Sequence, residues 1–372
     1  MRLSRLRNIL TLALAACTLS ACSWMEEDLS ECPDGLDVYF KYDYNMQRAD
    51  MFADHVGAVT VYVFDEHNRF VMQRSVANTA GNAPLKAHDF HIHFSSNELK
   101  PGKYSLLALA GQKDYAEMLA APGAKFRRTE LKKGDDIQKL MVTLDRGETT
   151  ADNTAPVEHE DMPLDTLWHG LNVRTVEITP DRTVDGVYAA VKDTISLTRD
   201  TKQLNITLRQ SEDEGEMLAD NFDVRIIDRN GLLAHDNTPD AADSRLCYTP
   251  YARWQTDAAD DAMGSAPGAV GLQAAHYELF TSRIMKHGDT ADDARLIITN
   301  RTNGEMVVDI PLPYYLTRDR DHFSLDRYTA QEFLDREYKY NLSFFLVGGR
   351  WQYMIFSIGI LDWGVRVQNE NL

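Results

Sequence analysis

The chain has 372 residues, and its 57 acidic against 39 basic residues give a formal net charge of −18 at pH 7. So large an excess of negative charge argues against nucleic acid as a partner, because phosphate backbones would be repelled. The chain is also longer than the size at which one hydrophobic core stops growing, so two domains are expected.

Residues 1–21 are typical of a bacterial lipoprotein signal peptide. Three arginines precede an apolar run from Ile9 to Ala16, which is too short to span a bilayer as a stable helix. The run leads into Leu19-Ser20-Ala21-Cys22, the pattern of a lipobox. We therefore predict cleavage after residue 21 and lipidation of Cys22 as the mature N-terminus. The alternative is an ordinary secretory signal that contains a cysteine by chance.

Residues 22–31 are predicted to form a lipidated tether. Acylation of both the thiol and the new amine of Cys22 would supply the more than one chain that stable anchoring requires. Position 23 is serine, not the aspartate that commonly retains lipoproteins in the inner membrane, and the acidic cluster Glu26-Glu27-Asp28 follows. We expect attachment to the outer membrane, with the body of the protein exposed at the cell surface.

Residues 32–150 have the pattern of a first β-sandwich. Apolar and polar residues alternate with period two from Leu36 to Tyr44, and residues 58–76 combine two β-rich runs around a polar turn, which predicts a hairpin. Further strands are expected at 90–94, 104–110 and 140–144, with helical turns in 47–55 and 113–120. Apolar periodicity is lost from Asp145 to Met162, and this predicts the domain boundary.

Residues 163–372 have the same pattern, with many short β-rich runs separated by turn residues, and this predicts a second β-sandwich. A hairpin is expected at Gly231, no regular element in the polar stretch 236–268, and a helical turn at 333–337. The whole chain is therefore predicted to be all-β, with two antiparallel β-sandwich domains in tandem. The expected strands are 187–191, 193–197, 204–208, 224–227, 274–284, 294–299, 305–310, 338–344, 351–360 and 363–367.

Two cysteines remain once Cys17 is removed with the signal peptide and Cys22 is acylated. Cys32 and Cys247 are an even pair in an oxidising compartment, which is compatible with one disulfide. A bridge that closes so long a loop would stabilise the fold by about 4 to 5 kcal/mol. The alternative is two buried free thiols, and no CxxC motif marks either cysteine as catalytic.

Catalytic motifs are missing from the sequence. It contains no GxSxG, HExxH, phosphate-binding GxxxxGK[ST] or GxGxxG pattern, so we predict neither an enzyme nor a cofactor. His88, His91 and His93 could converge on a metal, since alternate residues of a strand share a face. We favour the reading in which they form the solvated side of an amphipathic strand, and we predict no metal site.

Several short motifs, taken in order and together with the lipobox, resemble the fimbrillin-A-associated anchor proteins of the FimB type over essentially the whole mature chain. The motifs are Cys32-Pro33-x-Gly35-Leu36, Tyr42-x-Tyr44-Asn45-Met46, Val59 to Asp65, Leu99-Lys100-Pro101-Gly102-Lys103-Tyr104, Ala108-x-Ala110-Gly111, Leu167-Trp168-His169-Gly170, and Leu334-Asp335-Arg336-Glu337-Tyr338-x-Tyr340 with Trp363. The resemblance implies two transthyretin-like β-sandwiches and a surface lipoprotein that anchors a fimbrium to the outer membrane, with effects on fibre length. Cys22 matches the family's lipid attachment site, and no catalytic residue is carried over.

The sequence therefore favours a non-enzymatic anchor that holds a fimbrium through β-strand addition. Its expected partners are fimbrial (pilin) subunits and, through the lipid, the outer membrane. A strand edge presents unpaired N–H and C=O groups that a donated strand can satisfy. The alternative is a surface adhesin that binds glycan or host protein, and a metal-dependent hydrolase is a distant third.

Overall fold

The computed structural model describes residues 34–172, 174–179, 183–184, 187–210, 217–256, 273–318, 320, 327–358 and 365–368. The signal peptide, the tether, Cys22 and Cys32 lie outside the described residues. In the part of the chain that is described, no helix has both the length and the apolar character needed to cross a membrane.

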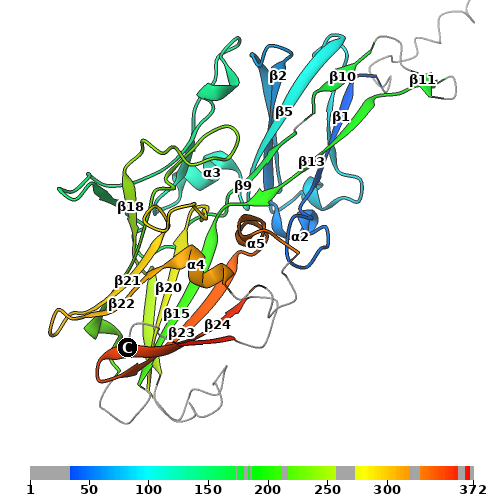
Figure 1. Ribbon diagram of the computed structural model, residues 1–372. Helices are drawn as coiled ribbons and strands as arrows, with labels where there is room; N and C mark the ends of the chain where they lie inside the picture. The colour runs from blue at the N-terminus through cyan, green and yellow to red at the C-terminus, as the bar shows by residue number, and fades with distance from the viewer. Residues whose placement is uncertain are drawn as a thin grey trace, which may run out of the picture.

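Strands dominate the structure and helices are short, so the predicted all-β class is confirmed (Figure 1). The helices are α2 (Phe52–His55), α3 (Tyr115–Ala120), α4 (Leu312–Thr317) and α5 (Ala330–Arg336), with 3-10 turns η2 (Pro84–Lys86), η3 (Ile137–Lys139) and η4 (Ala219–Asn221). The strands are β1 (Leu36–Lys41), β2 (Ala58–Asp65), β3 (Phe70–Ala77), β4 (His91–Phe94), β5 (Gly102–Gly111), β6 (Phe126–Arg128), β7 (Val142–Leu144), β8 (Thr154–Pro156), β9 (Trp168–Leu171), β10 (Val176–Ile178), β11 (Thr183–Val184), β12 (Val187–Tyr188), β13 (Val191–Ser196), β14 (Thr198–Arg199), β15 (Lys202–Gln210), β16 (Phe222–Asp228), β17 (Leu232–Leu233), β18 (Arg245–Tyr248), β19 (Ala252–Thr256), β20 (Ala274–Thr281), β21 (Arg295–Asn300), β22 (Met306–Pro311), β23 (Lys339–Val347), β24 (Arg350–Ile358) and β25 (Val365–Gln368).

Two sheets form the N-terminal sandwich. Sheet A has the strand order β13-β1-β4, and sheet B has the order β14-β9-β5-β2-β3 with β10 also paired to β5. Alternate residues of the central strands point into one core, which includes Leu36 and Val38 of β1, Val61 of β2, Leu106 of β5 and Trp168 of β9. The period-two alternation in the sequence is the direct cause of this packing, because successive side chains of a strand face opposite sides.

The centre of sheet B is buried on both faces. Every residue of β2 from Ala58 to Phe64 is buried, and its two sets of side chains enter different cores. Val61 packs inside the N-terminal sandwich, whereas Tyr62 and Phe64 belong to the second core, together with Phe126 and Leu144 from the segment that follows α3. That segment thus covers the outer face of sheet B.

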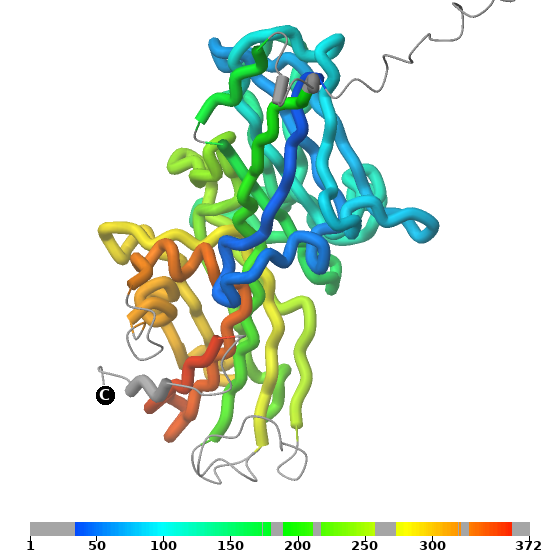
Figure 2. Tube along the Cα trace, turned by 90° about the vertical axis from the view of Figure 1, so that its right-hand side faces the viewer, coloured from blue at the N-terminus to red at the C-terminus, as the bar shows by residue number. Residues whose placement is uncertain are grey.

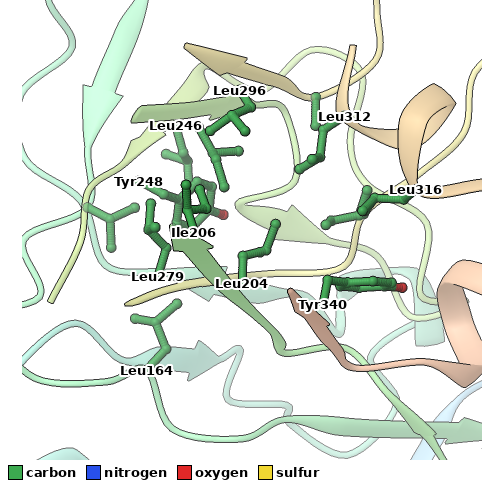
Figure 3. Packing of buried hydrophobic residues seen from close by; sticks show 14 of the residues in the cluster. Leu164, Leu204, Ile206, Leu246, Tyr248, Leu279, Leu296, Leu312, Leu316 and Tyr340 are labelled. Carbon is green, nitrogen blue, oxygen red and sulfur yellow. The ribbon is translucent and has the colours of Figure 1, made fainter. Parts of the chain in front are cut away.

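Two further sheets form the C-terminal sandwich. Sheet C has the order β19-β20-β15-β23-β24-β25, and sheet D has the order β22-β21-β16-β18-β8. Figure 3 shows their core, in which Leu204 and Ile206 of β15 lie among side chains from sheet D such as Leu246 and Leu296. Burying a leucine of this kind is worth about 1.5 to 3 kcal/mol. A small sheet E, β17-β7-β6, lies beside these.

The sheets do not divide at the predicted boundary. Strands β9, β10, β13 and β14 all follow residue 163, yet they complete sheets A and B, and β8 lies inside the expected linker but pairs with β18 of sheet D. The ranges 32–150 and 163–372 therefore do not match the two sandwiches. The chain passes from one to the other between Arg199 and Lys202. Low apolar content in 145–162 reflects exposed loops around one short strand, not a free linker.

Two local predictions in the second half were wrong. No hairpin forms at Gly231, because β17 pairs with β7 while β16 pairs with β18 and β21. The stretch 236–268 contains β18 and β19, although its composition is polar. Leu246 and Tyr248 of β18 are buried, so two apolar side chains in a short strand are enough once the neighbouring sheet supplies hydrogen bonds.

The two sandwiches lie end to end. Figure 2 shows β1 beginning at the end of the molecule remote from the C-terminal sandwich and running toward the middle. β13 runs parallel to β1, and β15 continues the same direction into the C-terminal sandwich. The start of the described chain and sheet C are thus at opposite ends of the protein.

Candidate functional site

The predicted site residues are only partly within the described structure. Cys22 and Cys32 lie outside it, so lipidation and the disulfide stay predictions. Cys247 lies half-buried on β18 opposite Ile227, with no disulfide partner among the described residues, and burial raises the pKa of its thiol. A thiol with a raised pKa is a poor nucleophile at neutral pH, which fits a structural role.

The three histidines do not gather at one point. His93 Nδ1 lies 2.7 Å from Asp37 Oδ1 and His91 Nε2 lies 3.7 Å from the same oxygen, whereas exposed His88 pairs with Asp89 instead. Among the described residues, no group of three His, Cys, Asp or Glu side chains could hold a metal ion.

The passage between the sandwiches instead has four consecutive buried polar residues in the described chain. Arg199, Asp200, Thr201 and Lys202 are each at most 6% exposed, although three of them carry ionisable side chains. Burial of ionisable groups is costly unless each one finds partners. We call these four residues and their partners, described next, the joint.

Lys202 ties its own segment to the end of α5. Its Nζ donates to the carbonyl oxygens of Arg199, Asp335 and Glu337, at 3.0, 3.2 and 2.9 Å. All three donor positions of the ammonium are used, which offsets part of its desolvation. Burial still lowers the pKa of Lys202.

A second cation of the joint is paired with a carboxylate. Arg283 Nε and Nη2 donate to the two oxygens of Asp335, at 2.9 and 2.7 Å, and both side chains are about nine-tenths buried. Asp200 accepts from Asn237 Nδ2 at 2.7 Å. Burial raises the pKa of Asp200 and that of Glu337, because their carboxylate forms lose hydration inside the joint.

Aromatic rings close the joint. The Arg199 guanidinium lies 3.8 Å from the ring centre of Tyr338 and 5.6 Å from that of Trp168, so it joins rings from the two sandwiches. Tyr42 meets Trp168 edge to face at 5.9 Å. Cation–π contacts out of water are worth about 2 kcal/mol, so the joint fixes one sandwich on the other.

The joint also contains a buried histidine. Its cations and carboxylates are held by backbone and side-chain partners. His169 Nε2 donates to the His235 carbonyl oxygen at 2.8 Å, and burial lowers the pKa of His169 to about 4. Sequence reasoning missed the joint because Thr198-Arg199-Asp200-Thr201-Lys202 has the composition of an exposed turn. The arrangement is therefore structural.

Asp228, at the end of β16, is a buried carboxylate outside the joint. It accepts from the backbone N–H of Arg229 at 2.7 Å and from Asn230 Nδ2 at 2.8 Å, and the Tyr248 hydroxyl donates to Asn230. Burial is the main cause that raises its pKa to about 7, and nearby Asp293 adds to the shift. The native state therefore holds a proton here that an unfolded chain loses near pH 4.

Asp228 is expected to make the protein less stable as pH rises. Because its folded pKa is above its unfolded value, its stabilising contribution is present in full below about pH 4 and is lost by about pH 7, up to about 4 kcal/mol. Urea unfolding of the wild type and of Asp228→Asn should be compared across that range. The pH-dependent contributions of the other carboxylates are the same in both proteins and cancel when the two free energies of unfolding are subtracted. The same pH dependence of stability in the two proteins would contradict the prediction.

A strand edge suited to a partner lies in the C-terminal sandwich. β19 pairs only with β20 within the described sheet, and its Arg253, Trp254 and Gln255 are exposed. The Trp254 indole stacks on the His276 imidazole at 5.2 Å, and His276 is held between the hydroxyls of Thr256 and Thr207. This edge combines an open hydrogen-bonding row with a fixed aromatic ring.

Comparison with known families agrees with this architecture. Residues 29–369 match the model of the fimbrillin-A associated anchor proteins Mfa1 and Mfa2. The chain belongs to this family. The resemblance drawn from the sequence motifs is thereby confirmed. A search of curated proteins finds no match.

Several solved structures are similar to this family member. A candidate polysaccharide-binding protein of Bacteroides thetaiotaomicron is 27% identical, with a TM-score of 0.69 over 91% of this chain and 100% of the other. A candidate adhesin from the same organism is 26% identical, with a TM-score of 0.68 over 92% and 100%. The fimbrial anchor protein Mfa2 of Porphyromonas gingivalis is 14% identical, with a TM-score of 0.58 over 90% and 100%, and shares the fold.

Proposed function

We propose that this protein is a non-enzymatic lipoprotein anchor: acylated at Cys22, attached to the outer membrane, and bound to a fimbrial subunit through β-strand addition, with an effect on fibre length. Family membership supports the association with fimbriae. The lipobox supports the lipid attachment.

The observation that carries the proposal is that the predicted lipid attachment and the edge strand β19 belong to opposite ends of the molecule. The described chain begins at the far end of the N-terminal sandwich, directly after the predicted tether, while the open edge of β19 belongs to the other sandwich (Figure 2). A lipid at one end and a strand edge at the other would connect a membrane to a fibre. A donated strand would satisfy the free N–H and C=O groups of β19, and its side chains would supply specificity.

Site-specific crosslinking tests this arrangement. A photo-reactive amino acid at Gln255, exposed on β19, should capture a fimbrial subunit in fimbriated cells, identified by mass spectrometry. The same group at Gln73, exposed on the edge strand β3 of the N-terminal sandwich, is the matched control and should capture none. Capture from Gln73 but not from Gln255 would contradict the choice of edge.

A second candidate function is adhesion to glycan. The exposed Trp254 ring, backed by His276, could stack on a sugar, and two similar structures are described as a candidate polysaccharide-binding protein and a candidate adhesin. Glycan-array binding that is lost in Trp254→Ala, with crosslinking to the subunit intact, would favour this function.

A further inference from the structure

We propose that β1 is a mechanical clamp, loaded in shear, through which tension passes from the tether to the body of the protein. The inference rests on the proposed function, because an anchored fibre pulls on the residues that follow the lipid. It concerns how the fold resists that pull, which family membership and strand addition leave open.

β1 is the central strand of sheet A and is held on both sides. It pairs in parallel with β13 over its full length, from Leu36 opposite Val191 to Lys41 opposite Ser196. It pairs with antiparallel β4 from Leu36 to Tyr39. One further hydrogen bond lies at each end of the parallel ladder: Val191 N–H donates to Gly35 O and Leu197 N–H donates to Lys41 O, each at 2.8 Å.

The direction of pull decides how these bonds are loaded. β1 begins at the free end of the N-terminal sandwich and points along the long direction of the molecule, toward the C-terminal sandwich (Figure 2). A force between the tether and the C-terminal sandwich therefore acts along the strand. Inter-strand hydrogen bonds lie across the strands, so both ladders are strained at the same time instead of opening one bond after another.

Packing adds to the resistance. Leu36 and Val38 are fully buried and Phe40 is 6% exposed, so sliding β1 would draw three apolar side chains out of the core. Gly35, just before the strand, has φ +94°, and a Cβ there would lie 2.1 Å from Phe94 O. The chain thus enters β1 pressed against the end of β4, which only glycine permits.

The chain connects β13 directly to the C-terminal sandwich, so it can transmit tension from β1. β13, the parallel partner of β1, leads through β14 into β15, the strand at the centre of sheet C. The joint lies on this route, where Arg199 and Lys202 bind residues of the C-terminal sandwich. Tension taken from β1 by β13 therefore reaches the sandwich that carries the open edge.

Single-molecule pulling in two directions tests the clamp. The mature chain, residues 22–372 with Cys22→Ser, carries one handle at its N-terminus and a click-reactive amino acid at exposed Asn97, plus a C-terminal handle. Pulling N-terminus to C-terminus loads β1 in shear. Pulling N-terminus to residue 97 separates the start of β1 from the neighbouring end of β4, since Leu36 lies opposite Phe94, and opens that ladder bond by bond.

Because the same protein is used in both directions, a folding defect cannot produce a difference. We expect the force at which β1 leaves sheet A, identified by the length of chain released, to be several-fold higher in shear, since forced unfolding follows the unfolding barrier in the loaded direction. Equal forces, or a lower force in shear, would overturn the clamp. Either result is independent of lipid labelling and subunit crosslinking, which test the proposed function.

Discussion

Replacing Cys22 with alanine is expected to abolish fatty-acid labelling of the protein and to release it, with any fibre it holds, from the outer membrane. The thiol of Cys22 is the acceptor of the diacylglycerol, and without it the lipoprotein cut has no substrate. Metabolic labelling with an alkynyl fatty acid, followed by membrane fractionation, measures both effects.

Cys32→Ala provides the control for this experiment. Cys32 lies ten residues further along the chain, directly after the predicted tether, so its loss removes a thiol but not the lipobox. It should leave the label unchanged. Equal labelling of the Cys22 variant and the wild type would refute lipidation at Cys22 and, with it, this route to the membrane.

The largest loss of stability is expected from breaking the ion pair of the joint. Arg283→Met leaves the Asp335 carboxylate, whose side chain is 8% exposed, without its bidentate partner. An uncompensated buried charge of this kind costs about 3 to 5 kcal/mol. Urea unfolding monitored by tryptophan fluorescence should show the loss.

Two further variants separate the buried charge from other effects. The double variant Arg283→Met/Asp335→Leu should recover part of the loss, because no unpaired charge remains. Arg295→Met breaks the comparable but more exposed pair with Asp309 on sheet D and should cost less than about 1 kcal/mol. Similar losses for Arg283→Met and Arg295→Met would show that the joint contributes no more than a surface pair.

The local pattern of apolar and turn residues was sufficient to predict many of the strands. The hairpin of β2 and β3, the strand β5 after Pro101-Gly102 and the strands β20 to β24 all match the sequence prediction closely, because alternation and turn residues act within a few positions. The family, too, could be recognised from motifs spread over the chain.

Partners distant in sequence could not be predicted in the same way. β13 has the pattern of a strand, but nothing in its own residues shows that it pairs with β1 of the first sandwich. The residues of the joint look like an exposed turn until partners such as Asp335, far along the chain, surround them. Tertiary contacts, not local preference, decide both cases.

The two parallel pairings also set the order in which the protein can fold. β1 must wait for β13, and β15 at the centre of sheet C must wait for β23, near the end of the chain. Pairings between such distant strands form slowly, because a long loop has to close before any contact rewards it. Neither sandwich can therefore be completed early in synthesis, and the chain stays open for most of that time. A polypeptide with the proposed destination has to cross the inner membrane unfolded, and the late pairing of β1 with β13 and of β15 with β23 favours that state.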